Sequence, residues 1–236
     1  MKNYLVKSLF KVKSTHWHFK DREEEGDIFD LYLRAHELSL KTYYKYLKPN
    51  FDVKFFTGEV ETINEAFKNT FWLIHDLWHS EPCNILYTDP DTIAFKEVDP
   101  WHYDKFMMFN YTDPKSLVLD DKVVFEHFFN AGVRYYPSTM TEHTWGLGRT
   151  LAFNWNPTTY HTEQYILNSM LWSQGLKPEE ILDTAMNWAL FINMDRPVSD
   201  EFNQTDLDRA KIMHLHASRD INMVVKIMED FIPMIL

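Results

Sequence analysis

The segment ILYTDPDTIAF, residues 85–95, joins a short apolar run to a turn that holds two carboxylates. The apolar run favours a buried strand, and Pro90 rigidifies the turn between Asp89 and Asp91 because its ring fixes φ. Two carboxylates this close repel each other unless a cation lies between them, and such hard oxygen ligands suit Mg²⁺ or Mn²⁺. A surface turn is the alternative, since Asp and Pro are both common turn residues.

The residues before this segment alternate between strand-like and helix-like patterns. Strands are expected over 4–12 and 51–57, and helices over 28–47 and 61–79. With the run at 85–87 they give the order β-α-β-α-β, which is typical of a parallel sheet covered by helices on both faces. Ligands of such sheets bind beyond the carboxyl ends of the strands, which is where the paired acids are expected.

The residues after this segment are less regular. Further strands are expected over 93–97, 105–111, 118–124, 128–136 and 213–216, and further helices over 162–174, 178–193 and 221–231. Gly146 and Gly148 lack the third glycine of a dinucleotide-binding motif, so we assign residues 145–149 to a loop. The sequence contains no repeat and no linker-like tract, which predicts one continuous domain over 1–236.

The composition limits the classes of function. The chain has 24 basic and 35 acidic residues and a formal net charge of −11, so nonspecific binding to nucleic acid is not expected. Cys83 is the single cysteine, which argues against disulfide frameworks and cysteine zinc clusters. No apolar run approaches the ~18 residues of a membrane span, and no secretory signal is recognisable. We therefore expect a cytoplasmic location.

Two further segments carry polar residues that could serve a site. His214 and His216 are two positions apart on an expected strand, so both side chains point to the same face and could ligate a metal. A solvated strand end is the alternative. In the run FFNAGVRYY, the small residues Asn130, Ala131 and Gly132 would let a ligand approach the backbone, or would simply form a β-bulge.

His161 and Glu163 lie at the start of the helix expected over 162–174. An acid in the first turn suits the helix dipole, and that structural role is sufficient by itself. The functional alternative has one of the two side chains projecting into a cleft, as a base, a nucleophile or a hydrogen-bond acceptor.

Taken in order, these segments resemble the GT-A class of nucleotide-sugar glycosyltransferases. ILYTDPDTIAF resembles the DxD motif of that class, and residues 129–133 resemble its F-N-(S/A)-G-(V/A) segment. Residues 161–164 are similar to its helix-opening acid element. Residues 214–217 are similar to the C-terminal histidine segment of the glycogenin-like and galactosyltransferase branches, although Ala217 stands where a glycine is usual.

The resemblance implies an α/β fold. It implies a single GT-A-like domain, with a mostly parallel central sheet, helices on both faces and a small second antiparallel sheet. Residues 1–97 would form approximately the nucleotide-binding half. Residues 98–236 would form the acceptor half and supply the C-terminal metal ligand.

The resemblance also implies roles for individual residues. Mn²⁺ or Mg²⁺ would be held by Asp91, by Asp89 unless that residue holds the ribose instead, and by one of the two histidines His214 and His216. A nucleotide-diphosphate sugar, with a UDP-sugar as the first expectation, would be bound by Asp89, Asp91, Asn130, Ala131, Gly132 and His161. Glu163 would face the anomeric carbon, with retention of configuration if it matches the blood-group-type branch. The acceptor could be a glycan, a protein or a modified base.

Two other functions stay open at this point. A nucleotidyltransferase acting on sugar phosphates would share the sheet and the paired acids, but it should carry a Gly-rich N-terminal loop that this sequence lacks. A noncatalytic carbohydrate-binding domain would use some of the 18 Phe, 12 Tyr and 8 Trp to stack sugars. In that case the paired acids would be a turn.

Overall fold

A computed structural model describes most of the chain. The described residues are 1–13, 28–109, 117–119, 122–154, 162–177, 186, 188–191, 209–216 and 221–236. His161 and most of the helix predicted over 178–193 lie outside these ranges. None of the helices within them combines the length and the hydropathy that a membrane crossing requires.

The centre of the molecule is a five-stranded sheet with the strand order β2-β1-β3-β8-β5. β1 (Lys2–Val12) pairs in parallel with β2 (Asp52–Val60) and with β3 (Cys83–Thr88). β8 (Val133–Tyr136) pairs antiparallel with both β3 and β5 (Met107–Met108). Within this sheet only β8 is reversed, so the sheet is mostly parallel in direction, as the sequence predicts.

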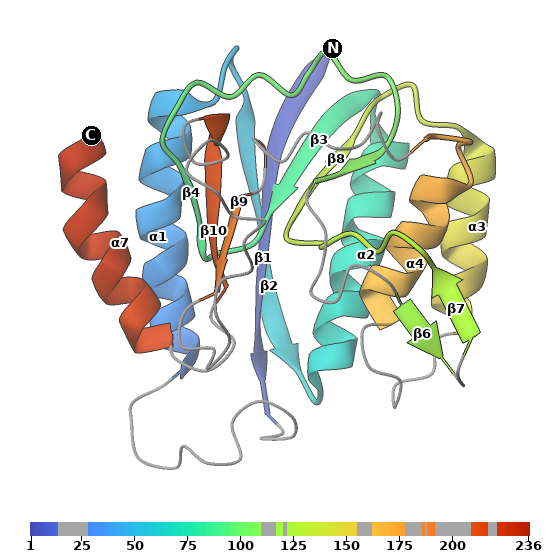
Figure 1. Ribbon diagram of the computed structural model, residues 1–236, viewed down its shortest axis with the longest axis horizontal. Coiled ribbons are helices and arrows are strands. Elements are labelled where there is room, and N and C mark those ends of the chain that lie inside the picture. Colours follow the sequence, from blue (N-terminus) through green and yellow to red (C-terminus); the bar gives the residue numbers. More distant parts are fainter. Residues whose placement is uncertain are drawn as a thin grey trace.

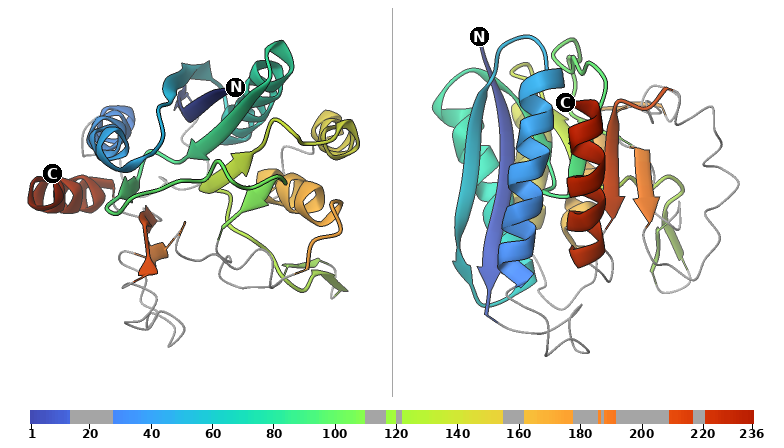
Figure 2. Two further views of the ribbon diagram at one scale, coloured as in Figure 1. Left: turned by 90° about the horizontal axis from the view of Figure 1, so that it is seen from above. Right: turned by 90° about the vertical axis from the view of Figure 1, so that its left-hand side faces the viewer.

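Helices cover both faces of this sheet (Figures 1 and 2). α1 (Ile28–Tyr46) and α7 (Ile221–Ile235) pack together on one side. α2 (Ile63–Ser80), α3 (Glu142–Phe153) and α4 (Thr162–Trp172) lie on the other. Because β1 is covered from both sides, its residues 4–7 are all buried and show no polar alternation.

Two smaller sheets complete the described fold. β4 (Thr92–Ala94), β10 (Ile212–His216) and β9 (Trp188–Phe191) form a mixed sheet in which β10 is antiparallel to β4 and parallel to β9. β6 (Leu117–Leu119) and β7 (Lys122–Phe125) form a small antiparallel sheet. The mixed sheet matters most for the site, because it brings the C-terminal part of the chain back to the residues that follow Asp91.

The structure confirms the β-α-β-α-β order of the first half and corrects three predictions in the second. The strand predicted over 118–124 is two paired strands, β6 and β7. Residues 188–191 form a strand instead of a helix, because pairing with β10 decides between the two readings of a short apolar run. Residues 145–149 lie in α3 and not in a loop.

The glycines of α3 explain why that helix is not evident from the sequence. A Cβ atom at Gly148 would lie 2.5 Å from Met170 Sδ and 3.1 Å from Phe71 Cζ. Gly148 therefore allows α3 to pack closely against α4 and α2. Glycine is an unfavourable helix residue by itself, so this packing outweighs its low propensity.

Candidate functional site

Three ionisable side chains converge at the carboxyl end of β3. His214 Nε2 lies 3.3 Å from Asp91 Oδ1 and 3.7 Å from Asp89 Oδ2. The ligand atoms of the three residues all lie within 4.8 Å of one another. The His214 side chain is 2 % exposed and that of Asp91 10 %, whereas Asp89 is open to solvent at 35 %. We call this group the acid cluster.

Strand pairing places His214 in the acid cluster. Residue 214 is opposite Thr92 in the β10–β4 ladder, and the backbone N–H of Leu215 donates to the Asp91 carbonyl at 2.9 Å. Burial alone would lower the pKa of His214, but the carboxylates of Asp91 and Asp89 raise it above its usual value. His216 also lies in β10, but its side chain is outside the described structure.

The donor set fits a divalent cation. Two carboxylates and one imidazole at this separation are side chains that ligate divalent cations in proteins. Partial burial and the neighbouring Asp91 raise the pKa of Asp89, and His214 opposes that shift. The cluster therefore combines ionisable ligands with an excess of negative charge, which a cation would offset.

The segment 130–132 lies directly against the acid cluster. A Cβ atom at Gly132 would be 2.2 Å from His214 Cε1 and 2.8 Å from Asp89 Oδ2, so only glycine fits there. The Asp89 N–H donates to the Gly132 carbonyl at 2.8 Å, and the Gly132 N–H donates to Asn130 Oδ1 at 2.8 Å. The structure thus brings together two motifs that are distant in the sequence.

α4 holds this segment in place from the other side. The Ala131 N–H donates to Gln164 Oε1 at 3.1 Å. Asn168 accepts from the Phe129 N–H and donates to the Phe129 carbonyl, at 2.8 and 2.9 Å. The backbone of the segment is therefore fixed by amide side chains of the same helix that carries Glu163.

Glu163 forms a buried ion pair with Arg134, a residue that sequence reasoning missed. Arg134 Nη1 lies 2.7 Å from Glu163 Oε1, with the two side chains 1 % and 10 % exposed. Burial raises the pKa of Glu163, and the guanidinium of Arg134 counteracts the rise. A charged residue in the apolar run Val133–Tyr136 was the available signal, because buried charges need a partner.

Lys7 is a second buried cation that sequence reasoning missed. Its Nζ donates to Ser39 Oγ at 2.8 Å and to the backbone carbonyl of Asp89 at 2.9 Å. Burial lowers the pKa of Lys7 to about 7, against the opposing effect of Asp89 and Asp91. The signal was again a charge in a buried strand, because residues 4–7 occupy the doubly covered β1.

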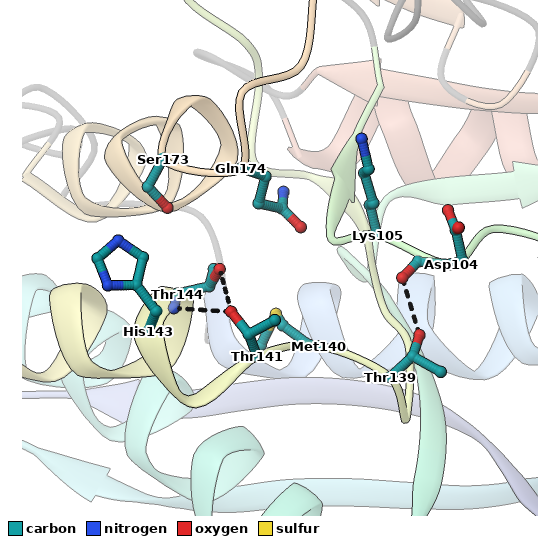
Figure 3. A pocket seen from close by; sticks show the side chains of 9 residues that line it. All are labelled: Asp104, Lys105, Thr139, Met140, Thr141, His143, Thr144, Ser173 and Gln174. Carbon is teal, nitrogen blue, oxygen red and sulfur yellow. Dashed lines mark hydrogen bonds between the residues drawn. The ribbon is translucent and has the colours of Figure 1, made fainter.

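A cavity of about 270 Å³ lies away from the acid cluster (Figure 3). Gly132 precedes β8 and Thr139 follows it, so the strand separates the two places. Thr141 caps the start of α3 by accepting from the Thr144 N–H. None of the predicted site residues lines the cavity. The residues that line it are Asp104, Lys105, Thr139, Met140, Thr141, His143, Thr144, Ser173 and Gln174.

Comparison with known proteins finds a similar fold but no similar sequence. No protein-family model and no curated protein matches the sequence. The structure matches that of a glycosyltransferase involved in the glycosylation of the major capsid of PBCV-1, with a TM-score of 0.54 and 10 % sequence identity. The match covers 98 % of this chain and 100 % of that one. The chain therefore has a GT-A-like α/β fold, with an Asp-x-Asp pair beside His214 at the end of β3.

Proposed function

We propose that this chain is a glycosyltransferase that moves a sugar from a nucleoside diphosphate sugar to a hydroxyl group of an acceptor. The observation that carries the proposal is the convergence of the Asp89–Asp91 turn, the segment 130–132 and His214 on one point. The similarity of the fold to a glycosyltransferase supports it. Residues to about 97 would supply the nucleotide site, and residues from about 98 the acceptor side.

Asp89, Asp91 and His214 would hold the cation, which would be Mn²⁺ or Mg²⁺. When bound, the cation would neutralise the diphosphate that leaves the sugar. A diphosphate would otherwise be repelled by the acid cluster in a chain of net charge −11. The donor is proposed to be a UDP-sugar, and the acceptor a glycan, a protein or a modified base.

Glu163 would stabilise the positive charge that develops on the sugar. As the bond between the anomeric carbon and the phosphate oxygen breaks, the electron pair leaves with the oxygen and the sugar becomes oxocarbenium-like. A buried carboxylate acts strongly on such a charge because few water molecules screen it. Asn130, Ala131 and Gly132 would line the approach of the sugar, since small residues leave the backbone accessible.

The experiment is a thermal-unfolding screen of UDP, GDP, CDP and ADP, each with and without Mn²⁺. We expect one nucleotide to stabilise the chain only with Mn²⁺, by about 2.7 kcal/mol at 100 times its dissociation constant. Asp91→Ala should abolish that stabilisation. Asp230→Ala, which removes an exposed acid on α7, should leave it intact.

The same screen separates the alternatives. Stabilisation by a nucleoside triphosphate or a sugar phosphate, but by no diphosphate, would point to a nucleotidyltransferase. If no nucleotide acts with Mn²⁺ present and free sugars stabilise the chain, the proposal is wrong and a carbohydrate-binding domain takes its place.

A further inference from the structure

Arg134 is held in a fixed orientation by a stack that crosses three neighbouring strands. It pairs with Tyr87 in the β3–β8 ladder, and its guanidinium carbon lies 3.9 Å from the centre of the Tyr87 ring. The Tyr87 hydroxyl is hydrogen-bonded to Ser8 Oγ at 3.0 Å, and Ser8 Oγ lies 2.8 Å from Thr70 Oγ1. The aromatic platform under Arg134 is therefore itself anchored on β1 and α2.

A single nitrogen of Arg134 connects the two parts of the proposed sugar site. Nη1 lies 2.7 Å from Glu163 Oε1 on α4 and donates to the Ala131 carbonyl at 3.2 Å. Ala131 adjoins Gly132, which touches both His214 and Asp89. Arg134 thus fixes the distance between the carboxylate of Glu163 and the wall of the acid cluster.

The stability of the fold does not explain this arrangement. Nε and Nη2 of Arg134 are buried and make no hydrogen bond of good geometry among the described residues, and the nearby Tyr136 hydroxyl interacts with the guanidinium. Leaving such donors unpaired is costly, and replacing a buried ion pair by apolar residues is often neutral or stabilising. Stability therefore gives little reason for keeping this charged pair, and its contacts with the segment 130–132 are the observation to explain.

We propose that Arg134 is a positioning residue that keeps the Glu163 carboxylate ionised and directed toward the sugar beside Gly132. Arg134 does not touch the substrate in this scheme. The inference rests on the proposed function, because it assigns Glu163 to the donor sugar. It identifies how a carboxylate buried on α4 retains the charge that the reaction requires.

Opposing effects act on the charge of Glu163. Burial and the negative charge of Asp89 favour the protonated form of the carboxyl group, whereas Arg134 favours the ionised form. The titratable phenols of Tyr87 and Tyr136 lie close enough to be influenced by Glu163 as well. Loss of Arg134 would therefore leave only influences that favour protonation.

The first test measures Glu163 directly in the metal-free chain. Glutamate labelled with ¹³C at the carboxyl carbon is titrated by NMR, and the Glu163 signal is the one missing from Glu163→Gln. In Arg134→Met we expect proton affinity at Glu163 to rise at least about tenfold. Arg149→Met is the matched control, because Arg149 pairs with Glu142 at the surface. An unchanged midpoint in Arg134→Met would overturn the inference.

The second test measures the release of UDP from UDP-glucose and UDP-galactose in Mn²⁺ across a range of pH. We expect the acid limb of the rate profile to move to higher pH in Arg134→Met, with partial recovery in Arg134→Lys. A structural role would instead lower the rate equally at all pH values and leave the limb in place. That result would also overturn the inference.

A double variant covers the case in which Arg134→Met does not fold. Arg134→Met with Glu163→Leu removes both charges, so we expect it to unfold no earlier than the wild type, to bind UDP with Mn²⁺ and to lose hydrolysis. Strong destabilisation, or hydrolysis that persists, would contradict the role of the pair. If the wild type itself neither binds nor hydrolyses nucleotide sugars, the proposed function fails, whereas the NMR titration still decides the role of Arg134.

Discussion

The acid cluster and the Arg134–Glu163 pair lie on two sides of the segment 130–132, and they differ in charge and in spacing. Arg134 and Glu163 balance each other one to one at 2.7 Å. The acid cluster holds two carboxylates, whose oxygens lie 3.3 Å (Asp91) and 3.7 Å (Asp89) from His214 Nε2. In the hydrogen bonds of the described residues, Lys7 reaches the backbone carbonyl of Asp89 and not its carboxylate. The tight pair has no net charge when both side chains are ionised. The wider, more acidic cluster has the charge and the room for a cation.

The largest expected effect is on the rate of reaction, and it distinguishes the Arg134–Glu163 pair from the acid cluster. Glu163→Gln keeps the shape of the side chain and removes its charge, so we expect UDP release from a UDP-sugar to fall about 10²–10³-fold. Binding of Mn²⁺ and UDP should stay within about twofold of the wild type. Asp91→Asn should instead lose the binding of Mn²⁺ and UDP, and the activity with it. Isothermal titration beside the rate assay measures both, and loss of Mn²⁺ binding in Glu163→Gln would contradict the separation.

Gly132→Ala tests the close contact between the segment 130–132 and the acid cluster. The added Cβ would lie 2.2 Å from His214 Cε1, so the imidazole or the segment must move. We expect a loss in Mn²⁺ affinity of about 10–100-fold, as for other changes that displace a ligand. Gly58→Ala is the control, since its Cβ would meet Phe10 at an ordinary 3.5 Å. Equal Mn²⁺ affinity in the two variants would show that Gly132 does not constrain the cluster.

The α3–α4 interface tests whether packing alone can alter the acid cluster. Gly148→Ala would press on Met170 and Phe71, and overpacking of this kind costs roughly 1–3 kcal/mol of stability. Gly146→Ala meets nothing closer than Arg149 Nη2 at 3.9 Å, so it should stabilise the helix by up to about 1 kcal/mol. Urea unfolding measures both. Neither variant should change Mn²⁺ affinity, and a change would show that the cluster depends on this interface.

The smallest expected effect comes from His36, a buried histidine outside both groups. Burial, with a further contribution from Lys7, lowers the pKa of His36 to about 4. The unfolded chain takes up this proton near pH 6.5 and the folded chain near pH 4, so the contribution of His36 is complete above pH 6.5 and is lost as the pH falls toward 4.

The free energy of unfolding of the wild type should fall between pH 7 and pH 4.5, and in His36→Phe this fall should be smaller by roughly 1–2 kcal/mol. The ring would keep its stacking on Phe55, which lies 4.1 Å from the imidazole between ring centres. The measurement is urea unfolding at several pH values, with the exposed His102→Phe as the control. The same pH dependence in both variants would mean that His36 is protonated in the folded chain.

How far the sequence could predict the site depends on the distance over which each contact forms. The Asp89–Asp91 turn follows from adjacent residues, and the structure places it at the end of β3 as expected. Arg134 and Lys7 were not predicted as site residues, because their partners lie on other strands and helices. The roles of Asn130, Ala131, Gly132 and Glu163 stay predictions, although the structure brings these residues beside the acid cluster.

The sequence by itself determined the β-α-β-α-β order, the doubly covered sheet and the paired acids after its third strand. These features depend on periodicity and on turn chemistry, which act between near neighbours in the chain. The tertiary structure alone placed His214 beside those acids, where the resemblance had implied either His214 or His216, and it alone showed that residues 188–191 form a strand and that Gly148 lies in a helix. Each of these outcomes depends on pairing or packing with a distant segment, which no local pattern specifies.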